Sequence, residues 1–225
     1  MAAPASHLII FDCDGVLVDS EPISFSVLRD TLANAGVNVS ESRAYQQFLG
    51  KSMATITRLI ADEFSISLGQ EHIEAMRREL FARFQAELQP IRGIRELLEN
   101  SPYTRCVASS SQPERIRLSL KKTGLIDFFE PNIFSATMVS KGKPAPDLFL
   151  HAAQSMGFAP SQCIVIEDSP AGIKAAHAAG MHVFAFTGGS HAEISNLREM
   201  VVSLEPAAIF DDMTALPGLI DTLRA

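Results

Sequence analysis

Two hydrophobic patterns follow one another along the chain and predict different kinds of structure. The apolar run at residues 8–11 is short and continuous, as in a strand that is buried on both faces. From residue 91 onwards, further short runs alternate with segments of helical spacing. This alternation predicts a parallel sheet covered by helices on both sides. The expected later strands are Cys106–Ala108, Asn132–Ser135, Cys163–Ile166 and His182–Phe186.

Between these two regions, apolar residues recur only at the spacing of helices. Three stripes show this pattern, and no strand signal of comparable strength interrupts them. They consist of Phe25, Leu28 and Leu32, then Ile56, Leu59, Ile60 and Phe64, then Ile73, Met76, Leu80, Phe81 and Phe84. We therefore predict an α/β core made of residues 1–17 and 91–225, with an all-helical domain, residues 18–90, inserted after the first strand.

The composition is that of an ordinary globular protein with an excess of acidic residues. The 225 residues are 47% hydrophobic, and the net charge of −7 argues against nucleic acid or an anionic membrane as the main partner. No apolar run is long enough for a membrane span, and the first seven residues lack the features of a signal peptide. Cys13, Cys106 and Cys163 match neither a disulfide framework nor a zinc spacing. We expect a cytoplasmic monomer or weak dimer with buried thiols.

Pairs of acidic residues follow two of the expected strands. Asp12 and Asp14 come directly after the first run, and Glu167 and Asp168 follow Cys163–Ile166. An Asp pair at a strand end can cap a turn, but ligands in open parallel sheets collect at these carboxyl ends. Four carboxylates near one point repel each other unless a cation compensates. Oxygen ligands of this kind suit Mg²⁺, which retains waters and binds substrate phosphate.

Serine and lysine residues complete a set of groups suited to phosphate. Ser109 and Ser110 end the second strand and precede a helix, where hydroxyls and free backbone N–H groups can hold an anion. Ordinary helix capping explains these serines equally well when they are taken alone. Lys143 lies between Gly142 and Pro144, so its backbone is stiff and its charge is positioned. Together with the acid pairs, these residues indicate phosphoryl transfer.

Four motifs resemble those of the haloacid dehalogenase superfamily, specifically its phosphatases and phosphomutases. Residues 12–21 match the first motif, Ser109 the second, Lys143 the third and residues 167–168 the fourth. The resemblance covers nearly the whole chain, with the motifs in the family's order. It implies a Rossmann-like core and a helical insertion that serves as a mobile cap.

The resemblance also implies a role for each matching residue. Asp12 would be the nucleophile that forms an aspartyl-phosphate, and Asp14 the general acid and base. Ser109, Ser110 and Lys143 would bind the phosphate. The implied Mg²⁺ ligands are Asp12, the Asp14 carbonyl, Glu167 and Asp168.

The implied activity is hydrolysis of a small phosphorylated metabolite, such as a sugar, polyol or sugar-acid phosphate. A β-phosphoglucomutase is the main alternative. Ser24 and Met53, however, stand where that group has His and Arg, which favours hydrolysis. A phospho-receiver or a silent binding protein is a remote alternative, since receivers are about half as long and every catalytic position here is filled.

Substrate choice is expected in the inserted domain. Gly50, Lys51 and Ser52 fit the family's specificity loop, and Lys51 could meet a hydroxyl or carboxylate of the substrate or simply be solvated. Arg77 and Arg78 could add positive charge, although a solvent-facing helix surface is the simpler interpretation.

Overall fold

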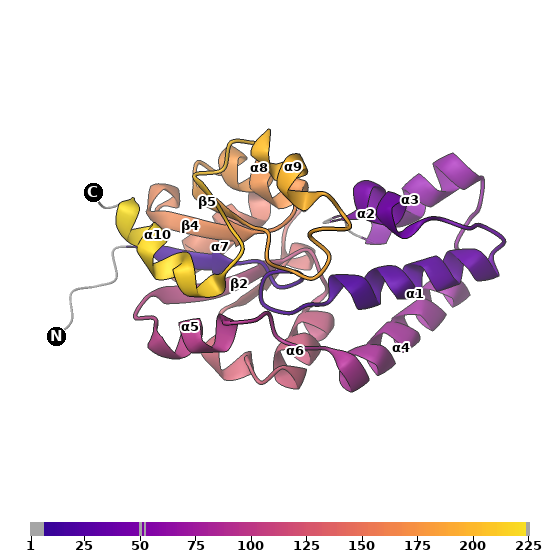
Figure 1. Ribbon diagram of the computed structural model, residues 1–225, viewed down its shortest axis with the longest axis horizontal. Helices are drawn as coiled ribbons and strands as arrows, with labels where there is room; N and C mark the ends of the chain where they lie inside the picture. The colour runs from indigo at the N-terminus through magenta and orange to yellow at the C-terminus, as the bar shows by residue number, and fades with distance from the viewer. Residues whose placement is uncertain (1–6, 50, 52, 224–225) are drawn as a thin grey trace.

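A six-stranded parallel sheet forms the centre of the computed structural model, which describes residues 7–49, 51 and 53–223 (Figure 1). The strand order is β3-β2-β1-β4-β5-β6, and every neighbouring pair is parallel. The strands are β1 (Leu8–Phe11), β2 (Thr104–Ser109), β3 (Ile133–Ser135), β4 (Cys163–Glu167), β5 (His182–Phe186) and β6 (Ala208–Phe210). The predicted α/β fold is confirmed. Strand β6 was not anticipated from the sequence.

The sheet is buried on both faces, which explains why its strands are continuously apolar. Leu8 and Ile10 of β1 belong to one apolar cluster, and Ile9 and Phe11 belong to a second one on the other face. Helices cover both sides in Figure 1. They are α7 (Asp147–Met156), α8 (Pro170–Ala178) and α9 (Leu197–Val202) on one side, with α5 (Ile94–Asn100), α6 (Pro113–Lys122) and α10 (Leu216–Thr222) on the other.

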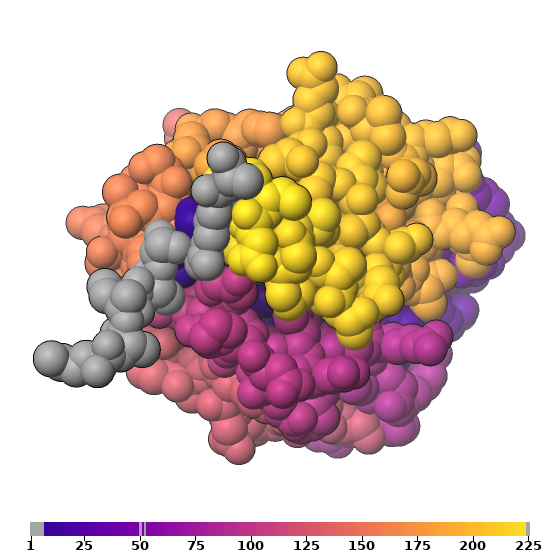
Figure 2. Space-filling view, turned by 60° about the vertical axis from the view of Figure 1, so that its left-hand side comes forward, coloured from indigo at the N-terminus to yellow at the C-terminus, as the bar shows by residue number. Residues whose placement is uncertain are grey.

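One end of the core is closed by the last helix. Figure 2 shows α10, in yellow, against α5, in magenta. The short helical turn Met213–Ala215, which leads into α10, contacts α5. The three cysteines are free and buried, as predicted. Within the described ranges, no helix is long and apolar enough to cross a membrane.

Four helices between Glu21 and Glu87 form a separate layer beyond the other end of the core, and we call them the helical insert. They are α1 (Glu21–Asn34), α2 (Glu41–Phe48), α3 (Met53–Phe64) and α4 (Gln70–Glu87). Helices α1 and α4 lie side by side and extend away from the sheet (Figure 1). The apolar stripe of α1 is buried, whereas in α4 only Met76 and Phe84 are. Part of the α4 stripe therefore contributes to something other than a closed core.

The two segments that connect the insert to the core are paired with each other. Val18 and Pro90 form an antiparallel bridge. The Asp19 N–H donates to the Gln89 carbonyl at 3.0 Å, and the Ile91 N–H donates to the Leu17 carbonyl at 3.0 Å. The chain thus enters and leaves the insert within one short hydrogen-bonded ladder.

Candidate active site

The polar ends of β1, β2 and β4 surround a pocket of about 80 Å³ at one edge of the sheet. It is lined by all the core residues expected from the sequence and by Lys51 of the insert. These are Asp12, Asp14, Ser109, Ser110, Lys143, Glu167 and Asp168. Gly50 and Ser52 lie outside the described residues. The lining also includes residues that had not been expected, namely Glu21, Phe48, Ser111, Arg115 and Ser169. We call this cavity the phosphate pocket.

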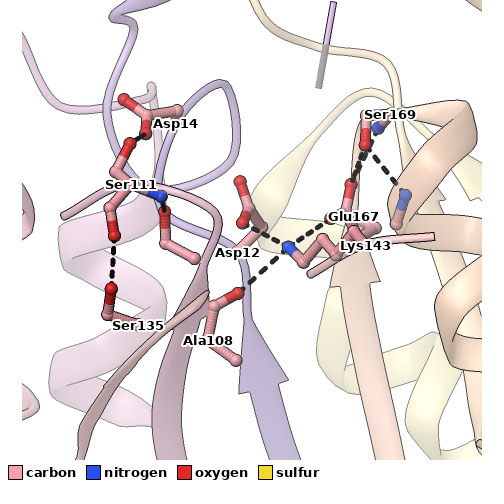
Figure 3. Close-up of polar contacts among 10 residues, drawn as sticks. Asp12, Asp14, Ala108, Ser111, Ser135, Lys143, Glu167 and Ser169 are labelled. Atoms are coloured by element: carbon pink, nitrogen blue, oxygen red, sulfur yellow. Dashed lines mark hydrogen bonds and ion pairs between the residues drawn. The ribbon is translucent and has the colours of Figure 1, made fainter. Parts of the chain in front are cut away.

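Lys143 is held between two carboxylates at the centre of the pocket (Figure 3). Its Nζ lies 2.6 Å from Asp12 Oδ1 and 2.6 Å from Glu167 Oε1, and it donates to the Ala108 carbonyl at 3.0 Å. The side chain is only 2% exposed. Burial alone would lower the pKa of Lys143, but the two carboxylates outweigh it and hold the pKa above its usual value. Lys143 is therefore a fixed cation.

In their ionised forms, Asp12, Glu167 and Asp168 together carry more negative charge than Lys143 balances. Burial raises the pKa of Asp12 well above its usual range despite Lys143, and the nearby carboxylates raise it further. Burial and the charge of Glu167 do the same to Asp168. Asp168 Oδ2 is buried without a hydrogen-bond partner, and His191 Nε2 lies 3.3 Å away without hydrogen-bond geometry. A site with unbalanced carboxylates invites a cation.

The oxygen atoms that line the pocket are chemically suited to bind Mg²⁺. They are carboxylate oxygens, the hard ligands that this ion prefers. No three His, Cys, Asp or Glu side chains among the described residues already stand in a coordinating arrangement. The Lys143 Nζ lies between Asp12 and Glu167, and this keeps the oxygens of the two carboxylates from converging on one point. The fit therefore rests on the excess charge and on the unpartnered Asp168 Oδ2.

The start of α8 fixes the second acid pair. Glu167 Oε2 accepts hydrogen bonds from the Ser169 N–H at 2.8 Å and from Ser169 Oγ at 3.0 Å. Ser169 Oγ in turn caps α8 by accepting from the Gly172 N–H at 3.0 Å. A Cβ at Gly172 would lie 1.8 Å from Glu167 Oε1. Glycine at this position is what allows Glu167 to reach the helix start.

Asp14 has an environment opposite to that of Asp12. Its oxygens accept from Ser20 Oγ at 2.6 Å, Ser111 Oγ at 2.7 Å and Arg115 Nη2 at 2.8 Å. Burial raises the pKa of Asp14, but Arg115 and the two hydroxyls outweigh it, so the pKa lies below its usual value. The two acids of the first motif thus stand two residues apart with pKa values moved in opposite directions.

The loop after β2 is held in place by hydrogen bonds on two sides. Ser109 Oγ accepts from the Ser111 N–H at 3.1 Å, and Ser135 Oγ at the end of β3 donates to the Ser111 carbonyl at 2.7 Å. Figure 3 shows Ser111 reaching from this loop to Asp14. Ser109 itself lines the pocket at the end of β2.

Arg115 is a site residue that sequence reasoning missed. It donates to Asp14 and also to Ser24 Oγ at 3.0 Å, and its guanidinium lies 5.1 Å from the centre of the Phe84 ring. It therefore links α6 of the core to α1 and α4 of the insert. A signal was present, because a basic residue in the first turn of a helix opposes the helix dipole and needs another reason to be there.

The insert contributes Glu21 and Lys51 to the phosphate pocket. Burial, followed by the charge of Asp14, raises the pKa of Glu21 to about 8. Lys51 Nζ donates to the Gln47 carbonyl, and burial lowers the pKa of its ammonium group. Arg77 is engaged in an ion pair with Glu114 of α6. Arg78 is exposed on α4 and does not line this pocket.

Comparison with known proteins agrees with the motifs and the fold. The family model of haloacid dehalogenase-like hydrolases matches residues 9–186. The 6-phosphogluconate phosphatase of Escherichia coli (strain K12) is 31% identical over 184 residues, which are 81% of this chain and 83% of that protein. Hexitol phosphatase A of the same organism is 32% identical over 213 residues, covering 89% of this chain and 92% of that protein.

Solved structures give the same result. A conserved haloacid dehalogenase-like protein of unknown function from Agrobacterium tumefaciens strain C58 superimposes with a TM-score of 0.84 at 35% identity. The alignment covers 97% of this chain and 99% of that one. With most of the chain matched by the family model and by full-length relatives, the protein belongs to the haloacid dehalogenase-like hydrolases, as its four motifs predicted.

Proposed function

We propose that the protein is a Mg²⁺-dependent phosphatase that hydrolyses a small phosphate monoester through an aspartyl-phosphate. The observation that carries this proposal is the contrast between Asp12 and Asp14. One carboxylate lies against Lys143 in the phosphate pocket, and the other is held by three donors. Two acids with such different partners in one pocket are suited to separate roles in one reaction, and a bound Mg²⁺ would favour the ionised, nucleophilic form of Asp12.

In the first step, an Asp12 oxygen attacks phosphorus as the bond from phosphorus to the ester oxygen breaks. Asp14 gives its proton to the departing alkoxide. The structure has Asp14 in surroundings that favour the carboxylate, and the charge of an incoming phosphate opposes this by raising its pKa. In the second step, Asp14 takes a proton from the water that attacks the aspartyl-phosphate. Asp12 and phosphate are then released.

The remaining phosphate oxygens are held by Lys143, by the Ser109 hydroxyl and by backbone N–H groups at the start of α6. Lys143 also reduces the repulsion between Asp12 and its anionic substrate. Because Lys143 is fixed by three acceptors, its charge needs no rearrangement as the transition state forms. Positioning and electrostatics account for most of the rate in phosphoryl transfer.

Mg²⁺ would be held by carboxylates of the two acid pairs and by a backbone carbonyl. The ligands that we propose are Asp12, the Asp14 carbonyl, Glu167 and Asp168. The ion would supply positive charge to the phosphate and to Asp12. Gly15 supports this proximity, because its φ is +80° and a Cβ there would lie 1.8 Å from Asp168 Oδ2. The first and fourth motifs are therefore in direct contact.

The test is phosphate release from a panel of sugar, polyol and sugar-acid phosphates, with Mg²⁺ and with EDTA. The names of the relatives, 6-phosphogluconate phosphatase and hexitol phosphatase, justify these starting compounds. We expect release that depends on Mg²⁺ and returns when Mg²⁺ is restored. Undiminished release in EDTA would overturn the metal assignment. Conversion of β-glucose 1-phosphate to glucose 6-phosphate without net release would make the protein a mutase.

A further inference from the structure

A second cavity adjoins the phosphate pocket at the junction of the core and the helical insert. Its volume is about 460 Å³, and we call it the chamber. The two cavities share part of their lining. The common residues are Lys51, Ser110, Ser111 and Arg115. A phosphate ester bound at Asp12 would therefore direct its alcohol portion into the chamber.

The walls of the chamber are mainly apolar. The insert provides most of them, from α1, α3 and α4. Representative residues are Phe25, Leu28, Ile56, Ile73, Met76 and Leu80. This explains the half-buried stripe of α4, because Ile73 and Leu80 pack against the apolar core on one side and line the chamber on the other. Such side chains offer no hydrogen bonds to an occupant.

The charged groups of the chamber are all basic among the described lining residues. They are Lys51, Arg77 and Arg115. Arg115 is engaged with Asp14, and Arg77 with Glu114. No carboxylate among the described residues lines the chamber, although the protein has a net charge of −7. The walls therefore oppose a cationic occupant and accept a neutral or anionic one.

These walls distinguish between kinds of alcohol. A polyol would lose the water on each buried hydroxyl and could replace it only at the minority of polar lining residues, such as Ser24, Gln112 and Thr137, which is unfavourable. An apolar alcohol would cover the same walls and remove apolar surface from water, which is favourable. The volume also lies within the range of about 300–1,000 Å³ that is typical of sites for drug-sized ligands.

We propose that the alcohol portion of the natural substrate is predominantly apolar and has no positive charge. This inference rests on the proposed phosphatase activity and deepens it. The phosphate pocket defines the reaction, whereas the chamber selects a substrate class different from the polyol and sugar-acid phosphates in the names of the relatives.

The first experiment compares esters with similar leaving groups. 2-(1-Naphthyl)ethyl phosphate, sorbitol 6-phosphate and glucose 6-phosphate all release a primary alcohol, so leaving-group acidity contributes little to the difference. We expect kcat/KM to be at least about tenfold higher for the naphthyl ester, the scale of discrimination that apolar pockets achieve. An equal or higher value for sorbitol 6-phosphate would overturn this inference and leave the phosphatase proposal standing. Release from none of the esters would overturn the phosphatase proposal itself.

The second experiment fills the chamber. Ala54 and Met53 on α3 line it, and neither is buried in the core. Ala54→Phe should lower the ratio of kcat/KM for the naphthyl ester over that for ethyl phosphate by about tenfold or more, and Met53→Gln by about threefold. The matched control is Ala75→Phe, at an exposed position of α4 outside the chamber lining. It should leave the ratio unchanged. An unchanged ratio in a folded Ala54→Phe variant would overturn the inference.

Discussion

The phosphate pocket and the chamber lie next to each other and share four residues, yet they differ in almost every other respect. The pocket is small, it lies at the ends of three strands, and most of its charged side chains have fixed partners. Lys143 has three acceptors and Asp14 has three donors. The chamber is several times larger and is lined mostly by the apolar side chains of helices in the insert.

This difference bears on two separate properties of the protein, its reaction type and its substrate class. Hydrogen bonds and ion pairs depend strongly on distance and angle, so the residues of the pocket tolerate few replacements. Apolar contacts have no direction, so the chamber can change shape without loss of the chemistry next to it. In the two proposals, reaction type and substrate class are therefore assigned to different parts of the chain. The following predictions test that separation, from the largest expected effect to the smallest.

Replacement of Asp12 should abolish turnover without harming the fold. Asp12→Asn removes the nucleophile, and we expect kcat to fall by about 10³-fold or more. The melting temperature should stay the same or rise, because burial and the neighbouring carboxylates disfavour the Asp12 charge. Phosphate release and thermal melts measure the two effects. Asp62→Asn, at an exposed position of α3, is the control. Turnover at the wild-type level would show that Asp12 is not the nucleophile.

Replacement of Lys143 should damage both activity and stability. Lys143→Met leaves Asp12 and Glu167 buried without their cation, a change that typically costs about 3–5 kcal/mol. Urea unfolding in EDTA measures the loss. Lys141→Met, two residues earlier and exposed, should change stability by less than about 0.5 kcal/mol. A loss below about 1 kcal/mol for Lys143→Met would contradict the role of Lys143 as an essential counterion.

Replacement of Arg115 should affect the proton-transfer role of Asp14. We expect Arg115→Met to lower kcat for an alkyl phosphate by about 10- to 100-fold, a part of the usual contribution of general acid and base catalysis. The loss should be smaller for 4-nitrophenyl phosphate, whose leaving group needs no proton. Arg117→Met is the control, because Arg117 pairs with Glu130 in an exposed ion pair. Equal losses for both esters would show that Arg115 does not act through Asp14.

The ion pair between Arg77 and Glu114 should contribute least. It joins α4 of the insert to α6 of the core, but the two side chains are 49% and 62% exposed. A double-mutant cycle with Arg77→Gln and Glu114→Gln should give a coupling energy below about 1 kcal/mol, and added salt should reduce it. A coupling of several kcal/mol would mean that this ion pair, rather than the chamber contacts, sets the position of the insert.

The sequence predicted the residues of the phosphate pocket better than those of the chamber, for a physical reason. A carboxylate at the end of an apolar run is costly unless it is used, so Asp12 and Asp168 stand out. Arg115 gives a weaker signal, its unfavourable position in the first turn of a helix, because basic residues on helix surfaces are common. Ile73 and Leu80 form the same periodic stripe whether they face a cavity or a packed core. Only the tertiary arrangement separates these two cases.

The paired segments at Val18 and Pro90 have a consequence for how such a protein can be rebuilt. Because the chain leaves and re-enters the core at adjacent positions of one ladder, joining these two points would preserve the path of the chain through the core. The length of the joining chain affects the closure entropy only slowly. We therefore expect the insert to be exchangeable, as a single module, for another helical unit that covers the core residues against which Ile23 and Phe84 now pack. The sheet and its catalytic edge would keep their register throughout the exchange.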